Sequence, residues 1–395
     1  MTGDVTPGAG HAAPAVRVTH LRVSYDSRRR RLTAVDDVSF EVGVGETVAV
    51  IGESGSGKST LLRAIAGLAV PASGRVEIAV GGASAGKVQV VFQDADLALD
   101  PRYPVWKAIA EPLIPRRLRI PKQLRETALD LLREVGLGGD LADRRPHQLS
   151  GGQRQRVTIA RALAARALLV LLDEPVSAQD VSLQGSLLRL LASIQRQHGL
   201  TYLIVSHDIA AVARVADRIG VMYAARLVEI GPAGLVLSQP RHPYTQALIN
   251  AVPRIADQWA AMPEHVITGE PPDLSNPPSG CRFRTRCAFA IDRCAAEVPV
   301  MEPSTSDDHR VACHRWREID AFPHSRPALH PGQTETRSPA QEQGTATART
   351  RERAGPPAAA QDLPGDIPED LPEDRPGGPA RDQMLPANGT DRSQC

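Results

Sequence analysis

A glycine-rich stretch near the start of the chain carries the residues best suited to chemistry: Gly52-Glu53-Ser54-Gly55-Ser56-Gly57-Lys58-Ser59-Thr60. An apolar, β-branched run at 47–51 precedes it and predicts a buried strand, and the run at 61–68 predicts a helix. Glycines let the backbone wrap around an anion, and amides at a helix start bind phosphate. Lys58 is then placed for the phosphates and Ser59 for Mg²⁺. This context predicts a P-loop rather than an ordinary glycine turn.

Acidic and basic side chains follow two other predicted strands. The wholly apolar run at 168–172 is typical of a central strand in a parallel sheet, and Asp173 and Glu174 come directly after it. Asp173 is placed to support Mg²⁺, and Glu174 to polarise a water against the γ-phosphate. His207 follows the predicted strand at 201–205, where ligands of α/β sheets bind. We interpret these residues as parts of the same site.

A second glycine pair lies further along, in Ser150-Gly151-Gly152-Gln153. Ser150 and Gln153 have the spacing of a capping box ahead of a predicted helix. The exposed amides of Gly151 and Gly152 would form a second phosphate site at the helix N-terminus. A capped helix without a ligand is the simpler alternative at this point.

The composition excludes several classes of protein. The chain has 395 residues and a formal net charge of +1, so two or three domains are expected and no global attraction to nucleic acid is indicated. No apolar run reaches the roughly 18 residues that span a bilayer, and the first residues lack a signal-peptide pattern. We therefore expect a protein that stays in the cytosol. Five cysteines in a reducing compartment argue against a disulfide framework.

The motifs taken in order resemble the ATP-binding cassette (ABC) ATPase family over about residues 16–250. The resemblance implies an α/β fold: a P-loop NTPase cassette with an antiparallel β-subdomain and an α-helical insert. A small C-terminal extension containing cysteines and a disordered tail would follow. We predict a disordered leader at 1–15, the cassette at 16–238 with its insert at about 97–160, the extension at 239–320, and a tail at 321–395 too poor in apolar residues to fold.

The same resemblance implies a role for each matching residue. Tyr25 would stack on adenine, and Gln93 would contact Mg²⁺ or the attacking water. Glu174 would be the catalytic base and His207 would contact the γ-phosphate. Cofactor binding is further assigned to Asp180 and to the P-loop, and metal binding to Ser59, Gln93 and Asp173. The Ser150 motif would close on ATP held by a partner subunit in a head-to-tail dimer.

Two positions depart from the family pattern without removing a catalytic group. Gln179 stands where the loop before Asp180 usually has leucine, and Ala225 stands where the last hairpin usually has glycine. An active ATPase that uses ATP and Mg²⁺ is therefore expected.

A narrower resemblance links the chain to the ATPase subunits of dipeptide, oligopeptide and nickel importers. It rests on Leu99-Asp100-Pro101-Arg102, on 242–248 and on Gly269-Glu270-Pro271-Pro272. It implies a peripheral subunit on the cytoplasmic face of the cell membrane, with transmembrane permease subunits and a sibling or identical ATPase as partners. An extracytoplasmic substrate-binding protein would act indirectly. A soluble ATPase of translation or DNA repair, and a non-hydrolysing regulatory subunit, are the alternatives.

Four of the five cysteines lie close together in the sequence. Cys281, Cys287, Cys294 and Cys313 are separated by five, six and eighteen residues, which lacks the spacing of a zinc ribbon. The pattern is compatible with a [4Fe–4S] cluster, with another metal, or with plain reduced thiols. The arginines at 282, 284 and 286 would offset the charge of a cluster or face a partner subunit.

Overall fold

The computed structural model describes residues 13–27, 30–79, 88–94, 98–114, 123–176, 181–251 and 267–319. The chain divides into two units, 1–335 and 336–395, and every described residue lies in the first. The predicted tail, most of the predicted leader, and Gln179 and Asp180 lie outside the described residues.

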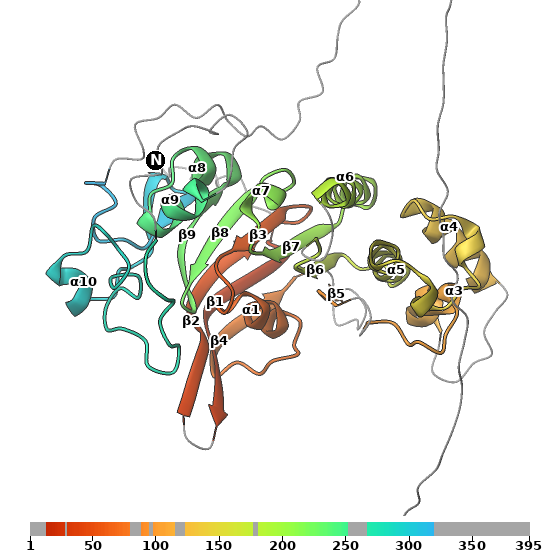
Figure 1. Cartoon of the computed structure of the whole chain (residues 1–395), viewed down its shortest axis with the longest axis horizontal. Coiled ribbons are helices and arrows are strands. Elements are labelled where there is room, and N and C mark those ends of the chain that lie inside the picture. Colours follow the sequence, from red (N-terminus) through yellow and green to blue (C-terminus); the bar gives the residue numbers. More distant parts are fainter. Residues whose placement is uncertain are drawn as a thin grey trace, which may run out of the picture. The chain divides into compact units, whose positions relative to one another are not determined.

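A mixed eight-stranded sheet forms the centre of the described structure (Figure 1). Its spatial order is β10 (Glu302–Ser306), β11 (His309–Val311), β9 (Arg226–Pro232), β8 (Arg218–Tyr223), β3 (Thr47–Ile51), β7 (Thr201–Ser206), β6 (Leu169–Asp173) and β5 (Val88–Val91). The strands from β5 to β8 are parallel, and β9 and β11 pair antiparallel. Parallel strands place their carboxyl ends at one edge, so the residues that follow β3, β6 and β7 are brought together.

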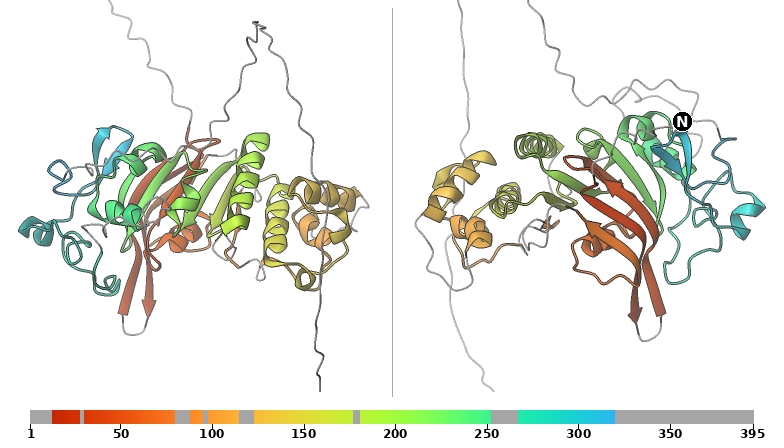
Figure 2. Two further views of the ribbon diagram at one scale, coloured as in Figure 1. Left: turned by 45° about the horizontal axis from the view of Figure 1, so that its top comes forward. Right: turned by 180° about the vertical axis from the view of Figure 1, so that it is seen from behind.

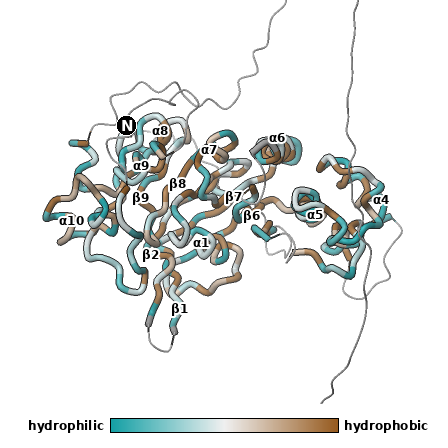
Figure 3. The backbone as a smooth tube through the Cα atoms, in the orientation of Figure 1, coloured by the Kyte–Doolittle hydropathy of each residue, from teal (hydrophilic) through white to brown (hydrophobic). Residues whose placement is uncertain are grey.

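The central strands are apolar along their whole length because both faces of the sheet are covered. All five residues of β3 are buried. Val48 and Val50 pack into one core and Ala49 and Ile51 into the other, as the two-residue period of a strand requires. Figure 3 shows the apolar character of this central region along β8. The sequence signal of continuous apolar runs therefore reflects burial on two sides.

An antiparallel sheet and the P-loop helix cover one of these faces. The sheet has the order β2 (Arg30–Val42), β1 (Val16–Ser27) and β4 (Ser73–Ile78). Helix α1 (Lys58–Ile65) contacts β1 and β2 on one side and β6 and β7 on the other. Leu61, Leu62 and Ile65 are at most 2 % exposed there. This packing fixes the start of α1 at the carboxyl edge of the central sheet.

The helical insert lies at the β5 edge of the sheet (Figure 2). It comprises α3 (Val105–Ala110), α4 (Gln123–Glu134) and α5 (Gly151–Ala164), with short 3-10 turns at Glu111–Leu113, Gly139–Leu141 and Pro146–Gln148. The remaining helices are α6 (Val181–His198), α7 (Ile209–Val212), α8 (Ala233–Ser238), α9 (Pro243–Asn250) and α10 (Asp292–Ala296). The predicted α/β architecture with an antiparallel sheet and a helical insert is confirmed.

Residues 239–319, here called the C-terminal extension, contribute strands to the central sheet. The hairpin of β8 and β9 around Ala225 does not end the sheet, because two further strands follow it. β11 pairs with β9 through Arg310–Ile230 and Val311–Glu229, and β10 follows it. β11 has only three residues, too short for a period of two to be read from the sequence.

Candidate nucleotide-binding site

The P-loop joins β3 to α1 in the expected way, with Lys58 as the first residue of the helix. Gly57 has φ 102°, and a Cβ there would lie 2.0 Å from the carbonyl oxygen of Ala34. A Cβ at Gly52 would lie 2.1 Å from the carbonyl oxygen of Met222. Only glycine fits both positions, so these two residues let the loop pack against β2 and β8.

Lys58 is 4 % exposed and is held by the loop itself. Its Nζ donates to the carbonyl oxygens of Gly52 and Glu53, each at 2.8 Å. Burial lowers the pKa of Lys58, and the carboxylates of Glu174 and Asp173 oppose that effect. The amine is thus held by two backbone carbonyls of the loop, with two carboxylates nearby.

Ser59 and Asp173 form the pair predicted for Mg²⁺. Ser59 Oγ donates to Asp173 Oδ1 at 2.9 Å, which connects the start of α1 to the end of β6. Burial raises the pKa of Asp173, and the Ser59 hydrogen bond works against this. A hydroxyl and a carboxylate at one point are hard oxygen ligands of the kind Mg²⁺ prefers, so this donor set fits the ion.

Glu174 lies within reach of both predicted partners. Its Oε2 is 3.1 Å from Gln93 Nε2 and 3.1 Å from His207 Nδ1. The residue has φ 47°, uncommon for a residue other than glycine, and its amide donates to the carbonyl of Val205 at 2.9 Å. The turn after β6 thus aims this carboxylate between two groups, which is suited to orienting a water for attack on a phosphate.

These residues surround a cavity of about 570 Å³ at the carboxyl edge of the sheet. It is lined by Tyr25, Leu32, Ala34, Ser54, Gly55, Gly57, Lys58, Ser59, Thr60, Gln93, Glu174, His207 and Leu274. Tyr25, on β1, is 44 % exposed and belongs to this lining. Sequence reasoning missed Leu274, because no period or motif of the chain links a residue of the C-terminal extension to this cavity.

The Ser150 motif forms the predicted capping box at the start of α5, but it does not line the cavity around Lys58. Ser150 is the N-cap of α5, with its Oγ accepting from the Gln153 amide at 3.3 Å and its own amide donating to Gln153 Oε1 at 2.9 Å. Ser150 and Gly151 are exposed, and neither they nor Gly152 line the cavity at Lys58. The chain therefore does not use this helix start for its own nucleotide cavity.

The four cysteines are free thiols, and Cys294 is buried. Burial raises the pKa of Cys287 to about 11 and that of Cys313 to about 12, and neighbouring thiols add to both shifts. Within the described residues, no group of three or more His, Cys, Asp or Glu side chains is arranged to hold a metal ion. For the part of the chain that the structure describes, the [4Fe–4S] cluster considered from the cysteine spacing is therefore not supported.

Comparison with known proteins places this site in a class. A P-loop, a carboxylate pair at the end of β6 and a histidine after β7 define a nucleotide-hydrolysing α/β ATPase. The family described as "ABC transporter" matches residues 35–177, and the family described as "Oligopeptide/dipeptide transporter, C-terminal region" matches residues 228–294. The chain belongs to the ABC transporter ATPases, in the group that carries this C-terminal region, and it is an ATPase.

Individual relatives agree with that assignment. The chain is 46 % identical over 292 residues to a "Probable peptide ABC transporter ATP-binding protein y4tS" of Sinorhizobium fredii, covering 71 % of this chain and 82 % of the relative. It is 42 % identical to the "Di/tripeptide transport ATP-binding protein DppF" of Pseudomonas aeruginosa, covering 73 % and 92 %. The cassette MJ0796, solved as a dimer bound to ADP and Pi, matches with TM-score 0.50 and 31 % identity over 55 % of this chain and 98 % of that one.

Proposed function

We propose that the chain is the ATP-hydrolysing subunit of an importer that carries dipeptides or oligopeptides through separate permease subunits. The match of residues 228–294 to the C-terminal region of oligopeptide and dipeptide transporters carries this proposal, because the cassette alone says nothing about cargo. Two curated relatives named for peptide transport support it. Nickel complexes are the second cargo class to be tested.

The subunit acts at the cytoplasmic face of the membrane in this proposal. Among the described residues, no helix is both long and apolar enough to span a bilayer. The permease is expected to contact the region near Gln93 and the insert at Trp106–Leu113. The proposal also keeps the predicted domain boundaries, which are a leader at 1–15, the cassette at 16–238, the extension at 239–320 and a tail at 321–395.

In the proposed mechanism of ATP hydrolysis, the polar side chains at the cavity of one subunit each have a role. Bound ATP would place its β- and γ-phosphates at Lys58 and the P-loop amides, and Mg²⁺ held by Ser59 and Asp173 would offset their charge. Glu174 would accept a proton from the attacking water. Gln93 and His207, each 3.1 Å from the Glu174 carboxylate, would hold that carboxylate and sense the γ-phosphate.

In the proposed dimer, each nucleotide cavity is completed by the Ser150 helix start of the other subunit. The family resemblance implies that the Ser150 helix start of one subunit caps the ATP held by the P-loop of the other, and its exposure and its place outside this chain's own cavity lining are compatible with that role. Mixing Lys58→Ala with Ser150→Ala tests this. Half of the dimers are then mixed and have one intact site, so about a quarter of the wild-type activity should return. Mixtures as inactive as either variant alone would refute the shared site.

The transport step is tested by reconstitution. The chain, its permease subunits and a binding protein are placed in vesicles, and uptake of labelled dipeptides, oligopeptides and nickel is measured with and without ATP. ATP-dependent peptide uptake supports the proposal. Co-purification with no integral membrane subunit, and no stimulated uptake, would favour the soluble ATPase alternative.

The four cysteine thiols themselves are given no role in the proposed hydrolysis. Iron and acid-labile sulfide analysis of anaerobically purified protein tests the predicted cluster, and finding neither element would refute it.

A further inference from the structure

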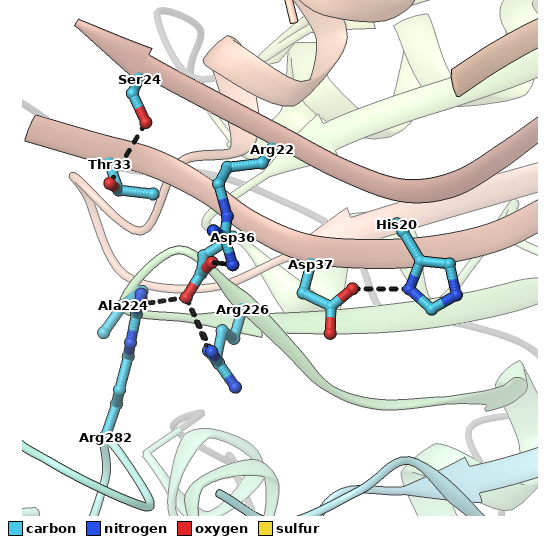
Figure 4. A network of polar contacts seen from close by, with 9 residues as sticks. All are labelled: His20, Arg22, Ser24, Thr33, Asp36, Asp37, Ala224, Arg226 and Arg282. Atoms are coloured by element: carbon cyan, nitrogen blue, oxygen red, sulfur yellow. Dashed lines mark hydrogen bonds and ion pairs between the residues drawn. The ribbon is translucent and has the colours of Figure 1, made fainter. Parts of the chain in front are cut away.

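The segment between the first two cysteines is anchored to the cassette by Arg282. Its guanidinium contacts the carbonyl oxygen of Ala224 and the carboxylate of Asp36. Asp36 also accepts from Arg22 and Arg226, each at 2.8 Å, so three arginines meet at one carboxylate (Figure 4). Burial alone would raise the pKa of Asp36, but these arginines lower it. The segment is thereby held beside the turn between β8 and β9.

Arg286 from the same segment reaches into the P-loop. Its Nη1 donates to the two carboxylate oxygens of Glu53 at 2.8 and 3.2 Å and lies 3.3 Å from the hydroxyl of Tyr223. The Arg286 side chain is 8 % exposed and the Glu53 side chain 26 %. Solvent therefore screens this pair much less than a surface ion pair. The third arginine, Arg284, donates instead to the carbonyl oxygen of Ser279, which lies just before Cys281 in the sequence.

The amide, the carbonyl and the carboxylate of Glu53 each form a hydrogen bond with a different residue. Its amide donates to the hydroxyl of Tyr244 at 2.9 Å, its carbonyl accepts from Lys58 Nζ at 2.8 Å, and its carboxylate accepts from Arg286. Tyr244 belongs to α9 and Arg286 to the cysteine segment, so two of the three partners come from the C-terminal extension. The third partner, which binds the Glu53 carbonyl, is Lys58, the proposed phosphate-binding lysine.

Three aromatic rings make the base of this arrangement rigid. Tyr223, Tyr244 and Phe283 are each at most 3 % exposed. Their ring centroids are 4.6 Å apart for Tyr223 and Tyr244, 5.1 Å for Tyr223 and Phe283, and 5.4 Å for Tyr244 and Phe283. Tilted and edge-on pairs at these separations are favourable. A shift of the cysteine segment would therefore be transmitted to β8, α9 and the P-loop together.

The extension also forms part of the wall of the nucleotide cavity. Leu274 lines that cavity together with Tyr25 and Leu32. The adjoining hollow of about 350 Å³ is lined by Pro271, Pro272 and Leu274 on one side and by P-loop residues on the other. The loop at 271–274 thus lies next to the P-loop on the side of the adenine-stacking candidate.

We propose that Arg286 is a positioning residue for nucleotide binding, through which the C-terminal extension sets the affinity of the P-loop for Mg·ATP. Arg286 neutralises the Glu53 carboxylate and fixes the peptide that Lys58 grips. Without the arginine, an unpaired carboxylate would lie in a loop that must accept the negative charge of a triphosphate. The inference rests on the nucleotide role proposed for the P-loop, and it does not depend on the cargo or the permease.

The test compares Arg286→Gln with Arg284→Gln in the full-length protein. Glutamine keeps part of the side-chain volume and a hydrogen-bond donor but removes the charge. Calorimetric titration with Mg·ATPγS and steady-state ATPase assays are run on both variants, on Glu53→Gln and on the double variant Arg286→Gln/Glu53→Gln. Arg284 serves as the matched control because it lies in the same segment and contacts neither the P-loop nor the cavity.

Arg286→Gln should weaken ATPγS binding about tenfold and raise KM similarly, with kcat changed less than about twofold. Arg286→Lys should restore most of the affinity, Arg284→Gln should bind as wild type does, and Arg286→Gln should have no further effect once Glu53 is Gln. Wild-type affinity in Arg286→Gln, or equal losses with and without the Glu53 carboxylate, would overturn the proposal. Absence of ATPγS binding by the wild-type protein would instead refute the nucleotide role of the P-loop.

Discussion

Replacing His309 with Ala should strongly destabilise the protein, because it breaks a fully buried contact between the C-terminal extension and the central sheet. Glu229 on β9 and His309 on β11 are both 0 % exposed, and His309 Nε2 lies 2.8 Å from Glu229 Oε1. The amides of Arg241 and His242 donate to the same carboxylate at 2.8 and 2.9 Å. The other ring nitrogen lies 2.9 Å from the Thr305 hydroxyl, which fixes the ring.

The expected magnitude follows from what remains after the substitution. Removing the hydrogen-bond partner of a buried carboxylate costs about 3–5 kcal/mol. Two backbone donors stay on Glu229, so we expect the lower end, about 3 kcal/mol, including the space left by the ring against Gly231. For a unit that spans residues 1–335, at about 2.1 cal/mol/K per residue, that corresponds to a decrease in Tm of about 4–5 °C.

Thermal unfolding followed by circular dichroism measures this change, and His147→Ala is the control. His147 is an exposed histidine of the 3-10 turn Pro146–Gln148, where a substitution should change stability by less than about 0.5 kcal/mol. The same His309 substitution in a Glu229→Gln background isolates the pair. A loss below about 1 kcal/mol, or an equal loss in both backgrounds, would refute the assigned Glu229–His309 contact, since the carboxylate accounts for most of the cost.

Three further substitutions test the site and the fold. Glu174→Gln should lower ATP turnover about 100- to 10,000-fold while calorimetry still detects ATP binding, and near-native turnover would exclude this base. Ala225 has φ 70° in the turn between β8 and β9, so Ala225→Gly should raise the free energy of unfolding by about 0.5–1 kcal/mol in urea titrations; a decrease would contradict the strain. Burial lowers the pKa of His242 to about 3, whereas an unfolded histidine titrates near pH 6.5. Between these two pKa values the unfolded state binds more protons, so stability is lost as the pH falls through this range. His242→Asn should therefore flatten the dependence of the free energy of unfolding on pH, measured between pH 7 and pH 4. An unchanged dependence would count against the buried, neutral His242.

Contiguous motifs explain why the nucleotide side of the molecule was predictable. The P-loop, the Asp173–Glu174 pair and His207 each follow an apolar strand, and parallel strands bring their carboxyl ends to one edge. The sequence pattern therefore predicted that Ser59 and Asp173 would meet, although they are 114 residues apart. Tyr25 lines the same cavity, and its role in stacking on adenine stays a prediction.

The contacts of the extension were not predictable in the same way. Arg286 was one of three arginines between cysteines, and nothing local distinguishes it from Arg284 or Arg282. The partners lie 233 residues apart for Arg286–Glu53 and 80 residues apart for His309–Glu229. Hydrophobic periodicity reports which face of an element is buried, and it contains no information about which distant side chain lies opposite.

One physical theme connects these unpredicted contacts. Asp36, Glu53 and Glu229 are partly or fully buried acids of the cassette, and the extension supplies a basic partner to each: Arg282, Arg286 and His309. An acid that loses its partner in such surroundings is costly, so an extension docked out of register would deprive Glu53 of its arginine and Glu229 of its histidine. Asp36 would lose Arg282 but keep Arg22 and Arg226. These pairs therefore specify the docking position more than they add net stability. Because one of the three acids lies in the P-loop itself, the position of the extension and the geometry of the ATP site are determined together.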